Sequence, residues 1–272
     1  RTATEPAKNG VHVSAVIDAR KGEFVVDTSG RKGLRSITLN DGRRIEADCL
    51  AVSGGWSPNV TLTCHHRGRP VWNDTVMGFV PGNDLPAGMQ VAGAANGQMT
   101  LAAALASGHD SAKAMARDLG FGRRVGNAPK ASDETFDTSA HWYITESTRR
   151  AWVDLQNDVT AKDIEQSLSE GFSAVEHVKR YTTLGMATDQ GKTSNTLGIA
   201  IMAAASGNAI PDTGTTIYRP PYTPVAIGAF AGRARGKEFR PFRLTPSHKW
   251  ARAHGADFVE TGMWLRAQWF KQ

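Results

Sequence analysis

The sequence predicts a mixed α/β fold, and three observations support this prediction. Short β-rich segments follow one another through residues 11–50, and Asp41-Gly42 between two of them is a typical hairpin turn. A helical pattern then runs from about Thr100 to Leu119, and further helical patterns occupy residues 160–206. Together these patterns indicate an α/β chain of 272 residues with more than one structural region.

The first region, residues 1–120, is predicted to contain both strands and a long helix. Two apolar runs, at residues 49–52 and 90–92, each end in a turn of small residues. Such runs are typical of strands in a parallel sheet that is buried on both faces. The helix that follows the second run is expected to end at Gly120, which suits the left-handed position after a helix. Shorter strands are expected at residues 12–17, 24–26, 34–39 and 44–47.

A polar linker, residues 121–150, separates this region from a small helical module at residues 151–206. Thr160 with Asp163, and Ser173 with Glu176, have the spacing of capping boxes at helix starts. A third helix from Ser194 onward is apolar on nearly all sides, so it should be buried.

The last part of the chain changes character twice. Residues 207–244 are rich in Pro and Gly and are interpreted as a connector, and residues 245–272 open a further region with a short helix near residues 248–254. The chain lacks an initiator Met and stops in an apolar run. We therefore expect it to begin and end inside a longer polypeptide.

Composition argues against several classes of protein. No apolar run approaches the length of about 18 residues that spans a bilayer, so no membrane role is expected. The net charge of +6 is spread out rather than gathered in a block, so no nucleic-acid partner is expected. With only Cys49 and Cys64, the chain is no disulfide scaffold, and a reducing cytoplasmic location is favoured.

Two glycine turns are the candidate dinucleotide site. Gly55 and Trp56 precede Ser-Pro-Asn after the first apolar run, and Gly93, Ala94 and Ala95 follow the second. This order resembles flavoproteins with two dinucleotide-binding domains, in which small residues let the backbone approach a pyrophosphate at a helix N-terminus. Ala stands at 94 where those proteins usually have Asp, and no G-x-G-x-x-G occurs. A plain α/β sheet with glycine turns and no ligand is the alternative.

The segment at residues 179–194 resembles an iron–sulfur loop without its cysteines. Modules that hold a 2Fe–2S cluster in amine-oxidising flavoenzymes have four cysteines, and Asp154, Gln156, Asp189 and Ser194 stand at the matching positions. Because the irons of such a cluster need thiolates, no metal is expected here. The segment is predicted to serve another cofactor or a subunit contact.

The order of these motifs along nearly the whole chain resembles the α subunits of heterotetrameric sarcosine oxidases. Besides the two glycine turns, the resemblance rests on residues 153–160, 178–192, 219–225 and 245–250. It implies the C-terminal part of a dinucleotide-binding region, then the cluster-less helical module, then the start of a folate-binding domain similar to an aminomethyltransferase.

The resemblance also implies an activity with several cofactors. Sarcosine would be oxidised to glycine at FAD in a β subunit, and O2 reduced to hydrogen peroxide at FMN near the α–β boundary. The one-carbon unit would pass to tetrahydrofolate in the α subunit, giving 5,10-methylenetetrahydrofolate, and NAD would bind in α. Partners would be β, γ and δ subunits, with a small-molecule substrate. The catalytic base would not lie in this chain, so its catalytic residues are unknown.

Within this scheme Lys192, Thr193 and Ser194 are the candidate residues beside FMN, because a cation and hydroxyl groups suit a phosphate or a polar ring edge. The alternative is a structural loop whose polar groups face water. Lys179 and Arg180 allow the same two interpretations, since cations also complement the C-terminal end of their own helix. For the whole chain, the alternatives are a subunit of a related amine or opine oxidase, or a non-catalytic scaffold that organises partner subunits.

Overall fold

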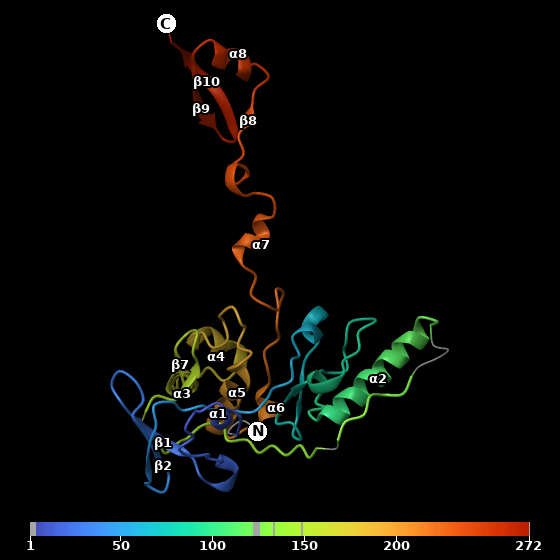
Figure 1. Cartoon of the computed structure of the whole chain (residues 1–272), viewed down its shortest axis with the longest axis vertical. Coiled ribbons are helices and arrows are strands. Elements are labelled where there is room, and N and C mark those ends of the chain that lie inside the picture. Colours follow the sequence, from blue (N-terminus) through green and yellow to red (C-terminus); the bar gives the residue numbers. More distant parts are fainter. Residues whose placement is uncertain (1–3, 122–125, 133, 148, 272) are drawn as a thin grey trace. The chain divides into compact units, whose positions relative to one another are not determined.

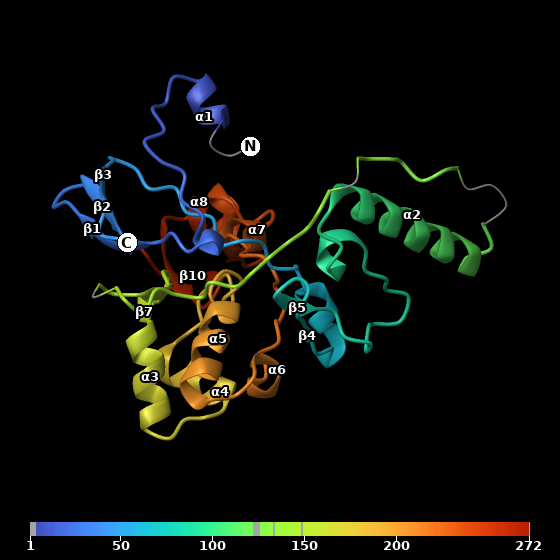
Figure 2. The same cartoon turned by 90° about the horizontal axis from the view of Figure 1, so that it is seen from below.

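The computed structural model describes residues 4–121, 126–132, 134–147 and 149–271 (Figures 1 and 2). The chain divides into two compact units, Arg1–Thr223 and Pro224–Gln272. Secondary structure is mixed, as predicted, with short helices and small sheets in both units. In the described ranges, no helix combines the length and the apolar character needed to cross a membrane.

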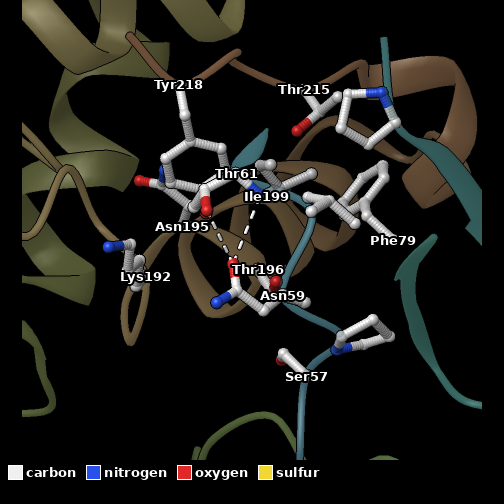
Figure 3. A pocket seen from close by; sticks show the side chains of 13 residues that line it. Ser57, Asn59, Thr61, Phe79, Lys192, Asn195, Thr196, Ile199, Thr215 and Tyr218 are labelled. Carbon is white, nitrogen blue, oxygen red and sulfur yellow. Dashed lines mark hydrogen bonds between the residues drawn. The ribbon is translucent and has the colours of Figure 1, made fainter. Parts of the chain in front are cut away.

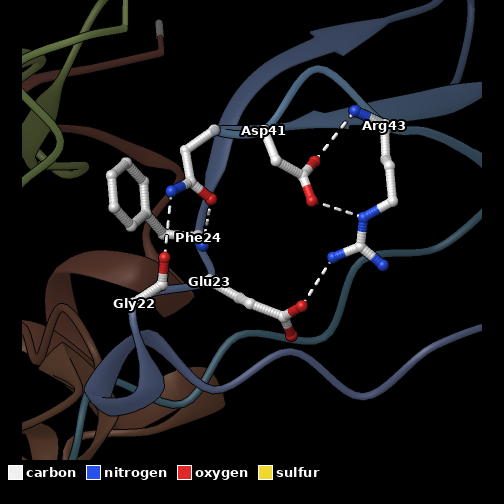
Figure 4. Close-up of polar contacts among 6 residues, drawn as sticks. Gly22, Glu23, Phe24, Asp41 and Arg43 are labelled. Atoms are coloured by element: carbon white, nitrogen blue, oxygen red, sulfur yellow. Dashed lines mark hydrogen bonds and ion pairs between the residues drawn. The ribbon is translucent and has the colours of Figure 1, made fainter.

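The first sheet of the larger unit is a three-stranded antiparallel meander. It contains β1 (Val25–Ser29), β2 (Ser36–Leu39) and β3 (Arg44–Glu46) in that order. The predicted turn at Asp41-Gly42 is confirmed, because Gly42 has a positive φ of 85° and β2 pairs with β3 on either side of it. Figure 4 shows the polar contacts at this end of the sheet, where the Arg43 guanidinium binds both Asp41 and Glu23.

The predicted strands at residues 12–17, 49–52 and 90–92 are wrong, since all three segments lack regular strand structure. The apolar side chains of the middle segment are exposed, Val52 by 80%. A strand needs a neighbour that accepts and donates its backbone hydrogen bonds, and no strand in the described part of the chain pairs with these segments. Instead, β4 (Val71–Asn73) and β5 (Gly78–Val80) form a separate hairpin, and β5 is buried.

The long helix of this region is confirmed as α2 (Leu101–Asp118). Thr100 caps it, because the Thr100 hydroxyl accepts a hydrogen bond from the amide of Ala103 at 3.2 Å. Gly120 has a φ of 79°, the left-handed conformation expected after the helix. The helix α1 (Thr4–Lys8) lies near the start of the chain, and short 3-10 turns occur at Ala19–Lys21, Leu62–Arg67, Gly93–Asn96 and Gly236–Glu238.

The helical module packs around one apolar core. A two-stranded pair, β6 (Trp152–Asp154) and β7 (Val159–Thr160), leads into α3 (Ala161–Ser169), α4 (Val175–Thr182), α5 (Asn195–Ser206) and α6 (Ile210–Thr213). Helices α3 and α5 lie side by side (Figure 2), and their fully buried residues include Ile164, Ile199 and Met202. The prediction that the last long helix is buried is therefore confirmed.

One of the two predicted capping boxes exists. Thr160 and Asp163 exchange side-chain and backbone hydrogen bonds at the start of α3, as expected. At the start of α4 the N-cap is Ala174 instead, without a side-chain cap, so the pairing of Ser173 with Glu176 is wrong. Glu176 pairs with Arg180 one turn further along α4, at 3.1 Å.

The smaller unit has a three-stranded sheet and two helices. Helix α7 (Ile227–Ala231) comes first, followed by β8 (Arg243–Leu244), α8 (His248–Ala253), β9 (Ala256–Thr261) and β10 (Trp264–Phe270), with the strand order β8-β10-β9. The helix predicted near residues 248–254 is thus confirmed as α8. It packs on the sheet through Trp250 against Phe270 and His248 against Phe258, with ring centroids 5.9 and 4.5 Å apart.

Candidate functional site

The two predicted dinucleotide residues after the first apolar run lie on the surface of the larger unit. Gly55 has a φ of 92°, and a Cβ added there would meet no atom within 4 Å. The side chain of Trp56 is 83% exposed. The backbone at Gly55 is therefore open to the close approach of a phosphate, which is the chemistry that a glycine permits.

The other predicted dinucleotide residues, Gly93, Ala94 and Ala95, form a 3-10 turn just before α2. The amide of Gly93 donates to the hydroxyl of Ser107 in α2 at 3.3 Å, and a Cβ at Gly93 would lie 3.6 Å from the Ala104 side chain. Glycine at 93 is therefore favoured by its positive φ of 69° rather than by close packing, and its amide already has a partner. Ala94 is exposed, and Ala95 is partly buried.

The four positions that match cluster cysteines lie in two loops, which are joined by hydrogen bonds. The first loop follows β6, and the second connects α4 to α5. Asp154 is 3% exposed, and its carboxylate accepts from the amides of Gln156 at 2.9 Å and Asn157 at 3.2 Å. The other oxygen of the same carboxylate accepts from the amide of Gly185 in the second loop at 2.8 Å. The hydroxyl of Thr188 donates to Gln156 at 3.3 Å, which makes a second link between the loops.

The side chain of Asn195 lies so close to the second loop that Gly185 and Gly191 have no room for a Cβ atom. A Cβ at Gly185 would lie 2.3 Å from the Asn195 side-chain oxygen, and a Cβ at Gly191 would lie 2.0 Å from it. Both glycines also have positive φ, 67° and 72°. The Asn195 amide donates to the Gln190 carbonyl at 3.0 Å and to the Thr216 hydroxyl at 3.2 Å. The loop is therefore folded tightly around one buried amide.

The three candidate FMN residues have different surroundings. Lys192 is half-buried, and its ammonium group donates to the main-chain carbonyl of Tyr222. Thr193 is exposed, and its hydroxyl lies 3.5 Å from Asp189. Ser194 is 2% exposed, and within the described residues its hydroxyl has no hydrogen-bond partner. An ammonium keeps two more protons for another acceptor, so Lys192 and Thr193 still fit a phosphate at the loop surface.

The loop between α4 and α5 also forms hydrogen bonds with the backbone of residues 219–222. The side-chain amide of Gln190 accepts from the Arg219 amide at 2.9 Å and donates to the carbonyls of Arg219 at 2.7 Å and Pro221 at 3.1 Å. With the contact from Lys192 to Tyr222, two side chains bind four backbone groups of this segment. These contacts give the Gln-Gly-Lys sequence a structural role.

The helix before the loop brings cations together. Burial lowers the pKa of Lys179, and the neighbouring charges of Arg219 and Arg180 lower it further, while Glu176 acts in the opposite direction. In the described residues no three His, Cys, Asp or Glu side chains gather in a way that could hold a metal ion.

A cavity of about 200 Å³ lies between the segment at residues 57–61 and the helical module (Figure 3). Tyr218 and Phe79 stand on opposite sides of this space. Its polar wall contains Ser57, Asn59, Thr61, Asn195, Thr196 and Thr215, and its apolar wall contains Pro58, Val60, Pro70 and Ile199. Lys192 contributes its side chain, and Figure 3 shows its nitrogen directed outward. This cavity could not be predicted from the sequence, because its walls come from four segments that lie far apart along the chain.

Apart from Lys192, the polar side chains that line this cavity are hydroxyls and amides. Asn59 accepts from both the amide and the hydroxyl of Thr61, at 3.2 and 2.8 Å. Burial raises the pKa of Tyr218, and burial also raises the pKa of the nearby Cys64 thiol, so both groups stay protonated at neutral pH. Among the residues that the structure describes, no carboxylate lines this space.

Comparisons with known proteins identify the family to which this chain belongs. Residues 148–233 match the family model of the sarcosine oxidase A3 domain. The chain is 41% identical over 287 aligned residues to sarcosine oxidase subunit alpha of Rhizobium meliloti, covering 98% of this chain and 29% of that relative. It is 39% identical to the subunits of the same name from two Corynebacterium strains, P-1 and U-96, covering 99% and 86% of this chain.

The chain belongs to the sarcosine oxidase α-subunit family, and it spans less than a third of the length of the relatives it matches. The resemblance inferred from the sequence is confirmed. The crystal structure of L-proline dehydrogenase from P. horikoshii shares the fold, with a TM-score of 0.61 and 18% identity over 84% of this chain and 47% of that one.

Proposed function

We propose that this chain is a segment of the α subunit of a working sarcosine oxidase. The assembled enzyme would convert sarcosine to glycine with O2 and tetrahydrofolate, giving hydrogen peroxide and 5,10-methylenetetrahydrofolate. The observation that supports this is similarity to three sarcosine oxidase α subunits along nearly the whole chain. The enzyme is proposed to be cytoplasmic and to contain β, γ and δ subunits. This segment contributes binding surfaces rather than the catalytic base.

In this proposal the larger unit takes part in binding NAD. Gly55 and Trp56 supply an open backbone and an exposed ring, and the turn at Gly93–Asn96 lies directly before α2. NAD would be bound by the intact subunit, while FAD would lie in β and tetrahydrofolate in the aminomethyltransferase-like domain that is proposed to start at residue 245.

FMN is proposed to lie beside the loop at residues 179–194. Thr183, Thr188 and Thr193 expose hydroxyl groups along this loop, and Lys192 adds a cation with free donor capacity. The Asn195 side chain donates to the Gln190 carbonyl within the loop, and the Gln190 side chain accepts from the Arg219 amide, so hydrogen bonds hold the loop in place. Bound FMN would supply the reduction of O2, and this chain would supply polar contacts to it.

The assembled enzyme tests the proposal. Co-expressed subunits should consume sarcosine and O2 and produce peroxide, with methylenetetrahydrofolate appearing when tetrahydrofolate is added. Lys192→Ala should lower FMN content or slow flavin reoxidation more than it slows reduction by sarcosine. Lys162→Ala, which removes an exposed lysine from α3, is the matched control. Absence of sarcosine turnover would contradict the proposed activity, and unchanged FMN content and reoxidation in Lys192→Ala would remove the loop from the flavin site.

A further inference from the structure

We infer that a basic surface on the larger unit, formed by Lys179 and Arg180 of α4 together with Arg219, binds an acidic segment of another subunit. The inference rests on the proposed function, in which this chain works inside an assembled oxidase, and it names the surface and the chemistry of one subunit contact. Its basis is an excess of positive charge on two segments that hydrogen bonds hold in place.

The three side chains come from a helix end and from a segment near residue 220. Lys179 and Arg180 lie in the last turn of α4. The backbone of Arg219 is fixed by Gln190, to which it donates from its amide at 2.9 Å and from which its carbonyl accepts at 2.7 Å. Because these contacts use only the backbone, the Arg219 guanidinium stays available, and a fixed backbone lowers the entropy that a partner must remove on binding.

Positive charge outweighs negative charge at this surface. Glu176 pairs with Arg180 at 3.1 Å, while among the residues that the structure describes neither Lys179 nor Arg219 has an ion-pair partner. Burial lowers the pKa of Lys179, and the charges of Arg219 and Arg180 lower it further, so the three cations lie within electrostatic reach of one another. One carboxylate therefore opposes three cations, and further carboxylates placed here would relieve their repulsion.

The openness of this surface favours a protein segment over a small anion. None of the three cations lines the cavity of Figure 3. The Arg180 side chain is 59% exposed, and Arg219 is exposed as well. Guanidinium groups pair with carboxylates through two parallel hydrogen bonds, and several Asp or Glu residues on one segment offer carboxylates to side chains that come from separate elements. Complementary charge of this kind guides two protein surfaces together and fixes their register.

Zero-length cross-linking of the assembled enzyme tests the inference. A water-soluble carbodiimide joins a lysine amine to a carboxylate that it contacts, and mass spectrometry of the digested complex identifies both residues. We expect Lys179 to be linked to an Asp or Glu of another subunit. Links from Lys179 only to residues of the α subunit itself, or no link from Lys179, would overturn the inference.

Two charge variants and a control measure the contribution of this surface to assembly. Arg219→Glu leaves the backbone contacts with Gln190 in place and should raise the dissociation constant of the complex at least about tenfold. Lys179→Gln should raise it about threefold to tenfold. Lys162→Glu reverses an exposed charge on α3 and should change it less than about twofold. Analytical ultracentrifugation over a dilution series gives the constants, and equal values for Arg219→Glu and the wild type would contradict the inference.

The stability of the chain distinguishes this role from a purely structural one. Lys179→Gln removes a repelling charge from beside Arg219 and Arg180, so the thermal unfolding midpoint should not fall. A lower midpoint together with an unchanged dissociation constant would assign Lys179 to the fold of the helical module and overturn its part in the contact.

FMN content separates this inference from the proposed function. In complexes that still form, the charge variants should keep the wild-type amount of FMN. Loss of FMN with unchanged association would overturn the inference and assign the three cations to a phosphate group. The cross-link is measured without turnover, so an assembly that fails to oxidise sarcosine would contradict the proposed function and leave this inference in place.

Discussion

The carboxylate of Asp154 accepts a 2.8 Å hydrogen bond from the amide of Gly185, which lies 31 residues further along the chain. Asp154 occupies a position where the iron–sulfur modules that this segment resembles have a cysteine. The link therefore joins the same two loops that a metal cluster would join. In this structure, hydrogen bonds between protein groups join these two loops.

Removing this carboxylate should destabilise the larger unit. Asp154→Ala leaves the amides of Gln156, Asn157 and Gly185 without their acceptor, and the last of these is buried. We expect a loss of about 2–4 kcal/mol in the free energy of unfolding, measured by urea denaturation. Asp212→Ala, at an exposed position, should change it by less than about 0.5 kcal/mol. Equal unfolding midpoints for the two variants would show that the link contributes little.

The loop glycines give a second pair of matched variants. Gly171 has a φ of 94° in open space, so Gly171→Ala should cost roughly 1 kcal/mol from backbone strain alone. Gly191→Ala adds a clash with the Asn195 side chain and should cost roughly 3 kcal/mol or more. Thermal unfolding of both variants measures the difference. A smaller effect at 191 than at 171 would mean that Asn195 moves aside freely.

Metal analysis should find no stoichiometric iron in the purified protein. Three of the four matching side chains are engaged in hydrogen bonds with protein groups, and none of the four carries a thiol. Iron and acid-labile sulfide assays on protein purified without chelators give the answer. One or two irons per chain would mean that the alignment with cluster cysteines is misplaced.

The exposed Ala94 offers a test of the proposed dinucleotide site. Ala94→Asp in the intact subunit places a carboxylate where a pyrophosphate is proposed, so NAD affinity should fall at least about tenfold through charge repulsion. Ala94→Asn, similar in size and uncharged, should lose much less. Calorimetric titration of NAD measures both variants, and unchanged affinity in Ala94→Asp would place the pyrophosphate elsewhere.

Local sequence signals predicted the helices better than the strands. The helix end at Gly120, the box formed by Thr160 and Asp163, and the apolar surface of α5 depend on residues close together in the sequence, so they can be recognised without tertiary context. The runs at residues 49–52 and 90–92 have strand composition, but a parallel strand exists only with a neighbour to pair with. In the described residues these runs have no such neighbour, and they lack regular secondary structure.

Of the candidate sites, the loop could be recognised in the sequence and the cavity could not. Residues 179–194 were recognised because their glycines and Gln190 keep a known pattern. The functions of these residues in the structure depend on Asn195 and on the backbone of Arg219, which come from later segments. The cavity could not be predicted, since Asn59, Phe79 and Tyr218 meet only after the chain has folded.

Native mass spectrometry of the intact subunit, purified with its co-expressed partners, tests the proposed subunit and cofactor composition most directly. We expect one assembly that contains this subunit with β, γ and δ chains, together with the masses of NAD, FAD and FMN. Recovery of the subunit alone, or of an assembly that turns over sarcosine without NAD bound to this subunit, would contradict it.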